Sequence, residues 1–356
     1  MGVARSATDP PPALLAAFCA DLLQAAGATE DNGAMVADAL VEAELQGIPS
    51  HGVMLLPLYL KRIAAGSVDP VATGAIVSDK AGALVMDAQN GFGQVTSHHA
   101  VELAVARARL HGLGAVSVRN GFHFGTAGRW AEAMARQGCI GIAMSNTRPL
   151  MPAPGGATRV VGNNPLSIAA PTGPDGKPVV VDIAMSAAAM GKIRLAEAAG
   201  RPIPADWATD AAGMPTTSAA EAITGMLLPT GGAKGFGLAM MVDILSGGLS
   251  AGAIGGEVAG LYGDPAAPYR CAHFFLAIDV AAFREEAAFG AAVTGFLETI
   301  RASRSVADGQ PVRVPGESSR QRQASAVACH LPASTMQALH DCAVELGRPV
   351  PAPLCL

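Results

Sequence analysis

Apolar residues in the first part of the chain recur at helical spacing. The clearest run repeats every three or four positions, at Met35, Val36, Ala39, Leu40 and Ala43. Residues 29–32 supply polar side chains that cap the start of this helix. A second helix is predicted after Ser50, strained by Pro57 and ended by Gly66. The pattern predicts that residues 1–80 form a helical region.

The pattern then changes to short apolar runs that alternate with helical stretches. Strands are predicted at residues 82–87, 114–118, 140–144, 179–183 and 273–278, and helices at residues 96–110, 126–137, 235–245 and 333–346. Gly112 and Gly138 end two of these helices. Residues 200–217 and 302–325 are rich in proline, glycine or polar residues and are predicted to be surface loops. The alternation predicts an α/β protein built on a sheet with crossover helices.

Composition adds an expectation about assembly. The chain has 356 residues, of which 50% are hydrophobic and only 15% are charged, and its net charge is −5. This length predicts two or three domains. Because so few charges are available to cover the surface, we expect apolar surface to be hidden between subunits of a homo-oligomer.

The same composition argues against several classes of protein. Lys and Arg residues do not cluster, so a nucleic-acid partner is not expected. The best candidate for a membrane span, residues 236–256, is broken by Asp243. The six cysteines form no CxxC pair, and the N-terminal residues lack the pattern of a signal peptide. We therefore expect a cytoplasmic protein with no membrane span, disulfide framework or bound metal.

The common phosphate-binding fingerprints are missing. The sequence has no GxGxxG, no GxxxxGK[ST] and no GxSxG motif. A Rossmann dinucleotide site, a P-loop NTPase and a serine hydrolase of the nucleophile-elbow type are therefore disfavoured.

Two histidines are candidates for chemistry. Ser50 precedes His51 at a predicted helix start, where the positive helix end would lower the pKa of the imidazole and favour the neutral ring. His123 follows a predicted strand, where catalytic groups often gather in α/β sheets. The simpler interpretations are a capping serine beside a surface histidine, and a loop histidine packed between two phenylalanines. The adjacent His98 and His99 have no spaced metal-binding partner and are interpreted as surface residues.

Two glycine-rich stretches are candidates for ligand binding. Residues 152–165 follow a predicted strand, and their glycines would let a ligand approach the backbone. Residues 231–237 place Lys234 beside free N–H groups at a helix start, which suits a pyrophosphate or ribose phosphate. Ordinary turns and a solvated lysine are the alternatives.

Taken together and in order, these segments resemble the malate/L-lactate dehydrogenase-like oxidoreductase family, which includes L-sulfolactate and ureidoglycolate dehydrogenases, diketogulonate reductase and piperideine/pyrroline-2-carboxylate reductases. The matching blocks are residues 47–53, 120–128, 145–165, 181–184, 191–192, 203–210, 234–248 and 312–317. Each block is short, but their number and order make the resemblance specific.

The resemblance implies a non-Rossmann fold and a homodimer. Residues 1–75 would form a helical domain completed by residues 300–356, and residues 76–299 would form a mixed-sheet domain that binds NAD(H) or NADP(H). His51 would be the proton donor or acceptor, supported by Ser50, with His123 as a second active-site histidine that also contacts the cofactor. The other cofactor contacts carry over to Thr147, Asp182, Ile183, Ala184, Lys234, Pro315, Gly316 and Glu317.

The chemistry implied by the resemblance is hydride transfer between nicotinamide and C2 of a small 2-oxo or 2-hydroxy acid, with His51 handling the proton. Two positions depart from the family pattern. Leu55 stands where many members carry an arginine that grips the substrate carboxylate, so Arg148 and Arg159 become candidates for that task. Lys192 stands where the cyclic-imine reductases carry an aspartate, which favours the hydroxy-acid branch.

Three functions therefore stay open. The first is a 2-oxo-acid or 2-hydroxy-acid oxidoreductase, and the second is a cyclic-imine or ketimine reductase. The third is a cofactor-binding protein that has lost catalysis, which the missing arginine makes conceivable. Retention of Ser50, His51, His123 and Lys234 weighs against the third. The choice between NAD and NADP does not follow from the sequence.

Overall fold

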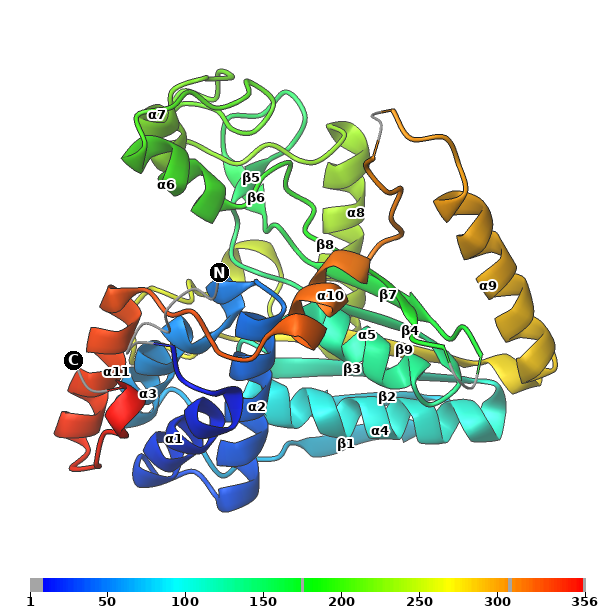
Figure 1. Cartoon of the computed structure of the whole chain (residues 1–356), viewed down its shortest axis with the longest axis horizontal. Coiled ribbons are helices and arrows are strands. Elements are labelled where there is room, and N and C mark those ends of the chain that lie inside the picture. The colour runs from blue at the N-terminus through cyan, green and yellow to red at the C-terminus, as the bar shows by residue number, and fades with distance from the viewer. Residues whose placement is uncertain (1–8, 174–175, 307–308, 355–356) are drawn as a thin grey trace.

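A seven-stranded mixed sheet forms the centre of the molecule (Figure 1). The computed structural model describes residues 9–173, 176–306 and 309–354. In spatial order, the strands are β1 (Ala75–Lys80), β2 (Ala83–Asp87), β3 (Leu113–Gly121), β9 (Cys271–Asp279), β4 (Cys139–Ser145), β7 (Leu166–Ala170) and β8 (Val179–Ile183). Among the described strands of this sheet, only β2 and β3 pair in parallel. A doubly wound parallel sheet is therefore excluded, as the missing GxGxxG predicted.

Helices cover both faces of the sheet because its central strands alternate two sets of buried side chains. On one face, Ala143 and Phe275 pack against α4 (Gly93–His111) and α5 (Ala127–Ala135). On the other face, Met144 and Phe274 pack against Val242 of α8 (Ala233–Asp243). A π-helical turn, Ile244–Gly248, continues α8 across β3 and β9.

A second core holds both ends of the chain together. It joins α1 (Pro12–Ala25), α2 (Glu30–Leu45) and α3 (Leu56–Ala64) to α11 (Ala333–Glu345). Leu22 and Leu40 from the N-terminal helices lie in one apolar cluster with Leu339 from α11. Figure 1 shows these helices side by side at one end of the sheet. The packing agrees with a helical unit that uses both ends of the chain.

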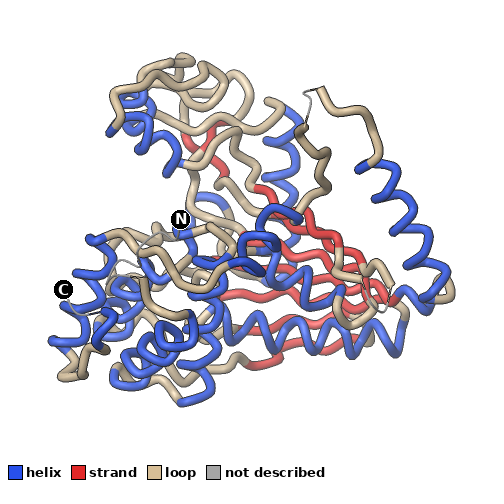
Figure 2. Tube along the Cα trace, in the orientation of Figure 1, coloured by secondary structure: helices blue, strands red, loops and turns tan. Residues whose placement is uncertain are grey.

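Two parts stand outside these cores. The first, which we call the excursion, comprises residues 147–163 and 185–232; it carries β5 (Met151–Pro152), β6 (Arg159–Val161), α6 (Met190–Ala198) and α7 (Ala219–Thr224), and much of it is irregular (Figure 2). The second is α9 (Glu286–Arg301), which stands at the side of the molecule. Within α9, only Gly290 and Leu297 are buried, and Gly290 packs on the backbone of Gly173.

Several sequence predictions need correction. Residues 302–325 are not only loop, because α10 (Glu317–Ser325) forms there. The helical region is shorter than predicted, since β1 occupies residues 75–80. Pro57 does not strain α3, because it lies in the first helical turn, where proline needs no hydrogen-bonded N–H. In the described part of the chain, no helix combines the length and apolar character that crossing a membrane requires.

Candidate active site

His51 lies in a tight turn that is fixed by a hydrogen bond to a partly buried carboxyl group. The turn consists of two short 3-10 helices, Pro49–His51 and Val53–Leu55, so Ser50 is not the helix cap that the sequence suggested. The Ser50 hydroxyl instead lies 3.0 Å from His51 Nδ1. The backbone N–H of Val53 donates to Glu44 Oε1 at 2.9 Å, and burial raises the pKa of Glu44 to about 7.

The pKa of His51 is lowered, as expected, but burial rather than a helix end is the cause. A lowered pKa leaves the ring neutral near pH 7. Such a ring can accept a proton from an alcohol or, once protonated, return it.

His123 lies next to His51, although it comes from the loop between β3 and α5. The two ring centroids are 5.3 Å apart. Burial lowers the pKa of His123 well below its ordinary value, and the nearby His51 and His273 lower it further. Two neutral imidazoles therefore lie side by side. The sequence-based alternatives of isolated surface and loop histidines do not account for this pairing.

Sequence analysis missed the polar groups that fix His123. Tyr59 of α3 places its hydroxyl 2.7 Å from His123 Nδ1, and Gln94 of α4 donates from Nε2 to the same hydroxyl at 3.0 Å. Both side chains are fully buried. Their only sequence signal is a polar group within an apolar helical stretch, which many structural residues share.

His273 on β9 connects the loop that carries His123 to Ser145 at the end of β4. Its Nε2 donates to the carbonyl of Phe122 at 3.1 Å, so its Nδ1 accepts from Ser145 Oγ at 2.9 Å. The ring stacks on Phe124 with centroids 4.5 Å apart. Burial lowers the pKa of His273 to about 4, which keeps the ring neutral. The loop that carries His123 is therefore anchored on both sides of that residue.

A buried network of two amides and one carboxylate holds the loop after β4. Asp243 accepts from Asn146 Nδ2 at 3.0 Å and from Asn164 Nδ2 at 2.9 Å. Asn164 Oδ1 in turn accepts from the backbone N–H of Thr147 at 2.9 Å. Thr147, a predicted cofactor contact, is thereby fixed from α8. Sequence analysis considered Asp243 only as an interruption of an apolar stretch.

The predicted cofactor residues from three distant segments meet around the end of β8. The Thr147 hydroxyl donates to Asn163 Oδ1 at 2.9 Å, and Met185 N, just after Ala184, donates to the carbonyl of Asn163 at 2.8 Å. The N–H of Thr230 then donates to the carbonyl of Met185 at 2.8 Å. These bonds place the Gly231–Gly232 start of α8, followed by Lys234, beside Asp182, Ile183 and Ala184.

The two charged side chains near this end of β8, Asp182 and Lys234, differ in their surroundings. Asp182 Oδ2 accepts from the backbone N–H of Gly128 at 2.9 Å, at the positive N-terminal end of α5. Lys234 is exposed, and its side-chain ammonium has no hydrogen-bond or ion-pair partner within the described residues. Gly231 and Gly232 both have positive φ, and open space surrounds the Cβ position of Gly232.

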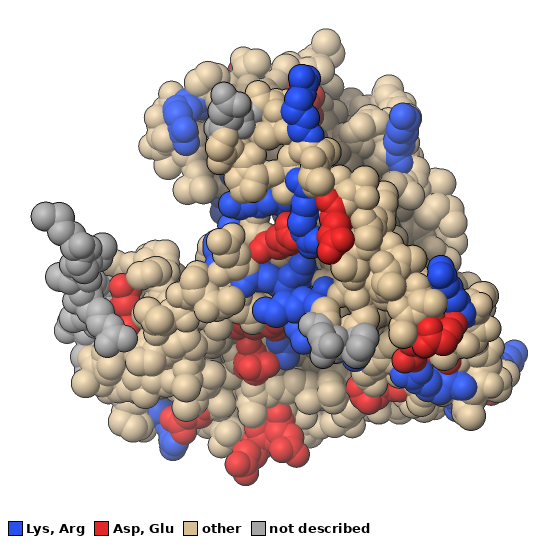
Figure 3. All heavy atoms as spheres, turned by 45° about the vertical axis from the view of Figure 1, so that its right-hand side comes forward, with Lys and Arg blue, Asp and Glu red and all other residues tan. Residues whose placement is uncertain are grey.

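Pro315, Gly316 and Glu317 come to the same strand from the C-terminal region. Gly316 has a φ of +83° and lies so close to the carbonyl of Val180 that a Cβ there would be 3.1 Å from it. Glu317 accepts from Val314 N at 3.0 Å and pairs with Arg301 at 2.7 Å. Figure 3 shows Lys and Arg side chains gathered around the inner end of the hollow between the excursion and the helical region.

The two candidate arginines occupy different surroundings. Arg159 donates to the carbonyls of Thr224 and Gly225 at the end of α7, so its guanidinium supports the excursion. Arg148 is exposed, and its guanidinium has no hydrogen-bonded or ion-pair partner among the described residues. Its Cδ passes over Gly260, where a Cβ would be only 3.2 Å away, and its charge acts on buried Tyr269. Tyr269 contacts Phe122 beside His123, with ring centroids 6.0 Å apart.

The remaining substrate candidate, Leu55, needs correction. Its side chain is 1% exposed and packs within the helical core, so it has no open face toward a substrate.

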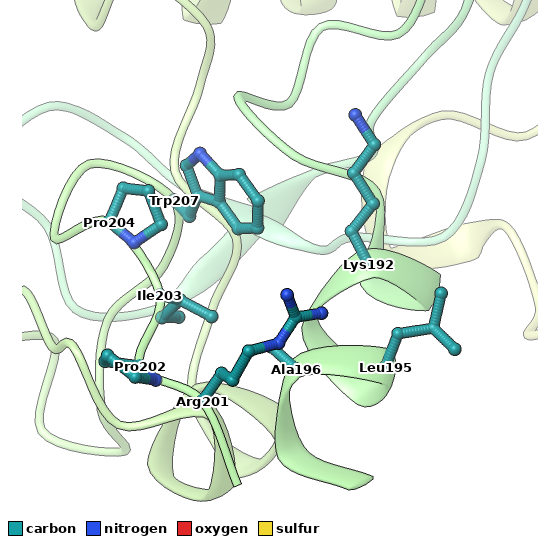
Figure 4. Close-up of a pocket in the computed structure, with 8 residues that line it drawn as sticks. All are labelled: Lys192, Leu195, Ala196, Arg201, Pro202, Ile203, Pro204 and Trp207. Atoms are coloured by element: carbon teal, nitrogen blue, oxygen red, sulfur yellow. The ribbon is translucent and has the colours of Figure 1, made fainter. Parts of the chain in front are cut away.

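Lys192 lies in α6 beside a pocket of about 290 Å³ on the excursion. Figure 4 shows Lys192, Arg201 and Trp207 around this pocket. The described residues contain no group of three or more His, Cys, Asp or Glu side chains that could hold a metal ion.

The comparison with protein families identifies residues 11–340 as malate/L-lactate dehydrogenase. A malate dehydrogenase of Pyrococcus abyssi is 37% identical over 311 residues, covering 85% of this chain and 84% of the relative. A (2R)-3-sulfolactate dehydrogenase (NADP(+)) of Chromohalobacter salexigens is 36% identical over 297 residues, covering 83% of this chain and 85% of the relative.

Solved structures give the same result for the fold. Sulfolactate dehydrogenase from Methanocaldococcus jannaschii superposes with a TM-score of 0.90 at 32% identity, covering 96% of this chain and 98% of that one. The delta1-piperideine-2-carboxylate reductase from Pseudomonas syringae superposes with a TM-score of 0.82 at 27% identity, covering 94% and 99%.

Proposed function

The chain belongs to the malate/L-lactate dehydrogenase family, and from that premise we propose that it transfers a hydride between NAD(H) or NADP(H) and C2 of a small 2-oxo or 2-hydroxy acid. Family membership makes it an oxidoreductase of hydroxy and oxo acids. The observation that carries the finer proposal is the pair of neutral histidines, whose ring centroids are 5.3 Å apart.

The residues around the end of β8 suit a nicotinamide dinucleotide. Lys234 and the free N–H groups at the start of α8 would hold the pyrophosphate, because both offer unpaired positive charge to an anion. Thr147, Asp182, Ile183, Ala184, Pro315, Gly316, Glu317 and His123 would complete the contacts. When bound, the nicotinamide supplies or accepts the hydride.

The proton is handled by His51 in this proposal. In the oxidation direction, neutral His51 accepts the hydroxyl proton of the substrate, and Ser50 orients the ring through its bond to Nδ1. In the reduction direction, protonated His51 returns the proton to the forming alkoxide. His123 completes the site from the adjacent loop.

Arg148 is the residue that we assign to the substrate carboxylate. Its guanidinium is exposed and unpaired within the described residues, whereas Arg159 is bound to helix carbonyls. A free guanidinium can grip a carboxylate with two parallel hydrogen bonds. Arg148→Ala is expected to raise KM for an oxo acid about 10-fold to 100-fold with a smaller change in kcat. Arg159→Ala is the matched control, and an equal rise in KM in both variants would contradict the assignment.

We also propose a cytoplasmic homodimer. Leu238, Met241, Ile244 and Leu249 on α8 and its continuation are between 42% and 55% exposed. A second copy that covered these side chains would account for an apolar surface on a chain with so few charges.

A 340 nm screen tests the proposed function. NADH and NADPH are each offered with pyruvate, oxaloacetate, sulfopyruvate, phenylpyruvate, diketogulonate and the two cyclic imines. We expect an open-chain oxo acid to be reduced. Turnover of the cyclic imines alone would instead assign the reductase activity named for the Pseudomonas syringae relative. Cofactor binding without turnover of any compound would support a protein that has lost catalysis.

A further inference from the structure

A series of buried hydrogen bonds from Gln94 through Tyr59 to His123 fixes more than the position of the imidazole ring. Tyr59 and Gln94 are both 0% exposed, and the ring of Tyr59 also packs in the helical core. The Tyr59 hydroxyl lies between Gln94 Nε2 at 3.0 Å and His123 Nδ1 at 2.7 Å. Such a chain has a direction, because each hydrogen bond needs one donor and one acceptor.

The direction follows from counting protons. The amide nitrogen of Gln94 can only donate, so the Tyr59 oxygen accepts from it. The single Tyr59 proton has no acceptor other than His123 Nδ1 among the hydrogen bonds of the described residues, so a buried Tyr59 hydroxyl is satisfied only if His123 Nδ1 accepts from it. A neutral imidazole that accepts at Nδ1 carries its proton on Nε2. Burial and the neighbouring histidines lower the pKa of His123 and thereby keep the ring neutral.

The orientation of the Gln94 amide supports the same direction. Its Oε1 is buried and has no partner in the structure. Turning the amide over would satisfy this oxygen but would leave both N–H donors of Nε2 without Tyr59 as a partner. A buried N–H group without a partner is rarer in proteins than an under-satisfied carbonyl.

We propose that Gln94 and Tyr59 are positioning residues that hold His123 as the neutral Nε2–H tautomer. In this state His123 donates a hydrogen bond to the reacting oxygen or carboxylate and takes no proton from the substrate. The transferred proton is therefore left to His51 alone, whose ring lies beside that of His123. The catalytic part of this inference rests on the proposed function, whereas the tautomer does not.

Nuclear magnetic resonance of the full-length protein with ¹⁵N-labelled histidine tests the tautomer without substrate. Signals of His123 are assigned from their loss in His123→Asn. We expect the wild-type protein at pH 7 to show an unprotonated Nδ1 and a protonated Nε2. A protonated Nδ1 would overturn the proposal.

Two variants test the source of the direction. Tyr59→Phe removes the donor, and Gln94→Met removes the group that orients it, so both should give a mixture of tautomers. Because there are two variants, the test can still be made if one of them does not fold. Tyr262→Phe is the control, because this hydroxyl belongs to an exposed residue and no hydrogen bond joins it to His123 among those of the described residues. An unchanged single tautomer in both test variants would overturn the roles of Tyr59 and Gln94.

Kinetics then test which of the two histidines transfers the proton. With the oxo acid found by the screen, Tyr59→Phe should raise KM about 10-fold, while the pKa in the pH profile of kcat/KM stays that of His51. A shift of that pKa in Tyr59→Phe would assign proton transfer to His123 and overturn the proposal. If no compound is turned over, the proposed function fails, but the resonance measurement still decides the tautomer.

Discussion

The two sides of the candidate site are built in opposite ways. On the histidine side, His123, His273 and Asn146 are bonded to other protein groups, and His273 and Asn146 are fully buried. On the side formed by β8 and α8, Lys234 is exposed. Its ammonium, like the guanidinium of Arg148 in the loop after β4, is unpaired within the described residues. The difference suggests that the protein prepares the geometry of proton transfer in advance and leaves its cations open for charged ligands.

Removal of the imidazole that we propose as the proton donor and acceptor should have the largest effect. His51→Ala is expected to lower kcat about 10²-fold to 10⁴-fold, because positioned proton transfer contributes that much. The affinity for NADH or NADPH should stay unchanged, since binding is assigned to the other side. Steady-state kinetics and fluorescence titration measure the two quantities. His98→Ala, at an exposed histidine, is the control, and equal activity in both variants would remove His51 from the mechanism.

Breaking the buried network should reduce stability next most strongly. Asp243→Ala leaves the Nδ2 groups of Asn146 and Asn164 without a carboxylate, and both amides are fully buried. Unpaired buried donors of this kind should lower the free energy of unfolding by about 3 kcal/mol. Urea unfolding measures the change, with Asp206→Ala at an exposed position as control. A loss no greater than that of the control would show that the network is not a stabilising element.

A smaller effect is expected at the open side. Lys234→Gln removes one exposed charge from the start of α8. The Kd for NADH or NADPH should rise about 10-fold, which corresponds to about 1.4 kcal/mol, with little change in stability. Calorimetric titration measures the Kd. Lys80→Gln on β1 is the matched control, and a Kd that stays at the wild-type value would place the pyrophosphate elsewhere.

The smallest expected effect is that of pH around neutrality on kcat/KM for the oxidation of a hydroxy acid. Burial holds the pKa of His51 below its ordinary value of 6.5, so the ring is already neutral at pH 7. For oxidation of a hydroxy acid, kcat/KM should fall as pH decreases through this lowered pKa and change less than about twofold from pH 7 to 8. For reduction, which needs protonated His51, kcat/KM should instead decrease about 10-fold per pH unit above this pKa. A profile of oxidation that still rises steeply above pH 7 would require a different proton acceptor.

The sequence predicted those parts of the fold that have a clear apolar pattern. The predicted strand at residues 179–183 coincides with β8, and the predicted strand at 140–144 lies within β4. α10 was missed because Glu317–Ser325 is polar throughout and has no apolar face. α9 was also missed, although Phe289, Val293, Phe296 and Ile300 recur in it at helical spacing. Apolar periodicity therefore could have predicted α9 but not α10, which has no apolar face.

The site was predictable only in part, for a related reason. Residue type and local context indicated His51, His123 and Lys234, and the resemblance supplied the other proposed cofactor contacts, which stay predictions. Tyr59 and Gln94 were not found, because their importance comes from a meeting of α3, α4 and the loop after β3. The sequence of any one of these segments does not show that it contacts the other two.

The most direct test of the central claim follows the hydride itself. Enzyme is incubated with oxaloacetate or sulfopyruvate and with NADH or NADPH that carries deuterium at C4 of the nicotinamide, in each stereochemical form. Mass spectrometry and proton resonance then locate the label in the hydroxy acid. The account predicts one deuterium at C2 of the product with one of the two cofactor forms. A hydroxy acid formed with both forms but without deuterium at C2 would contradict hydride transfer between the nicotinamide and the substrate.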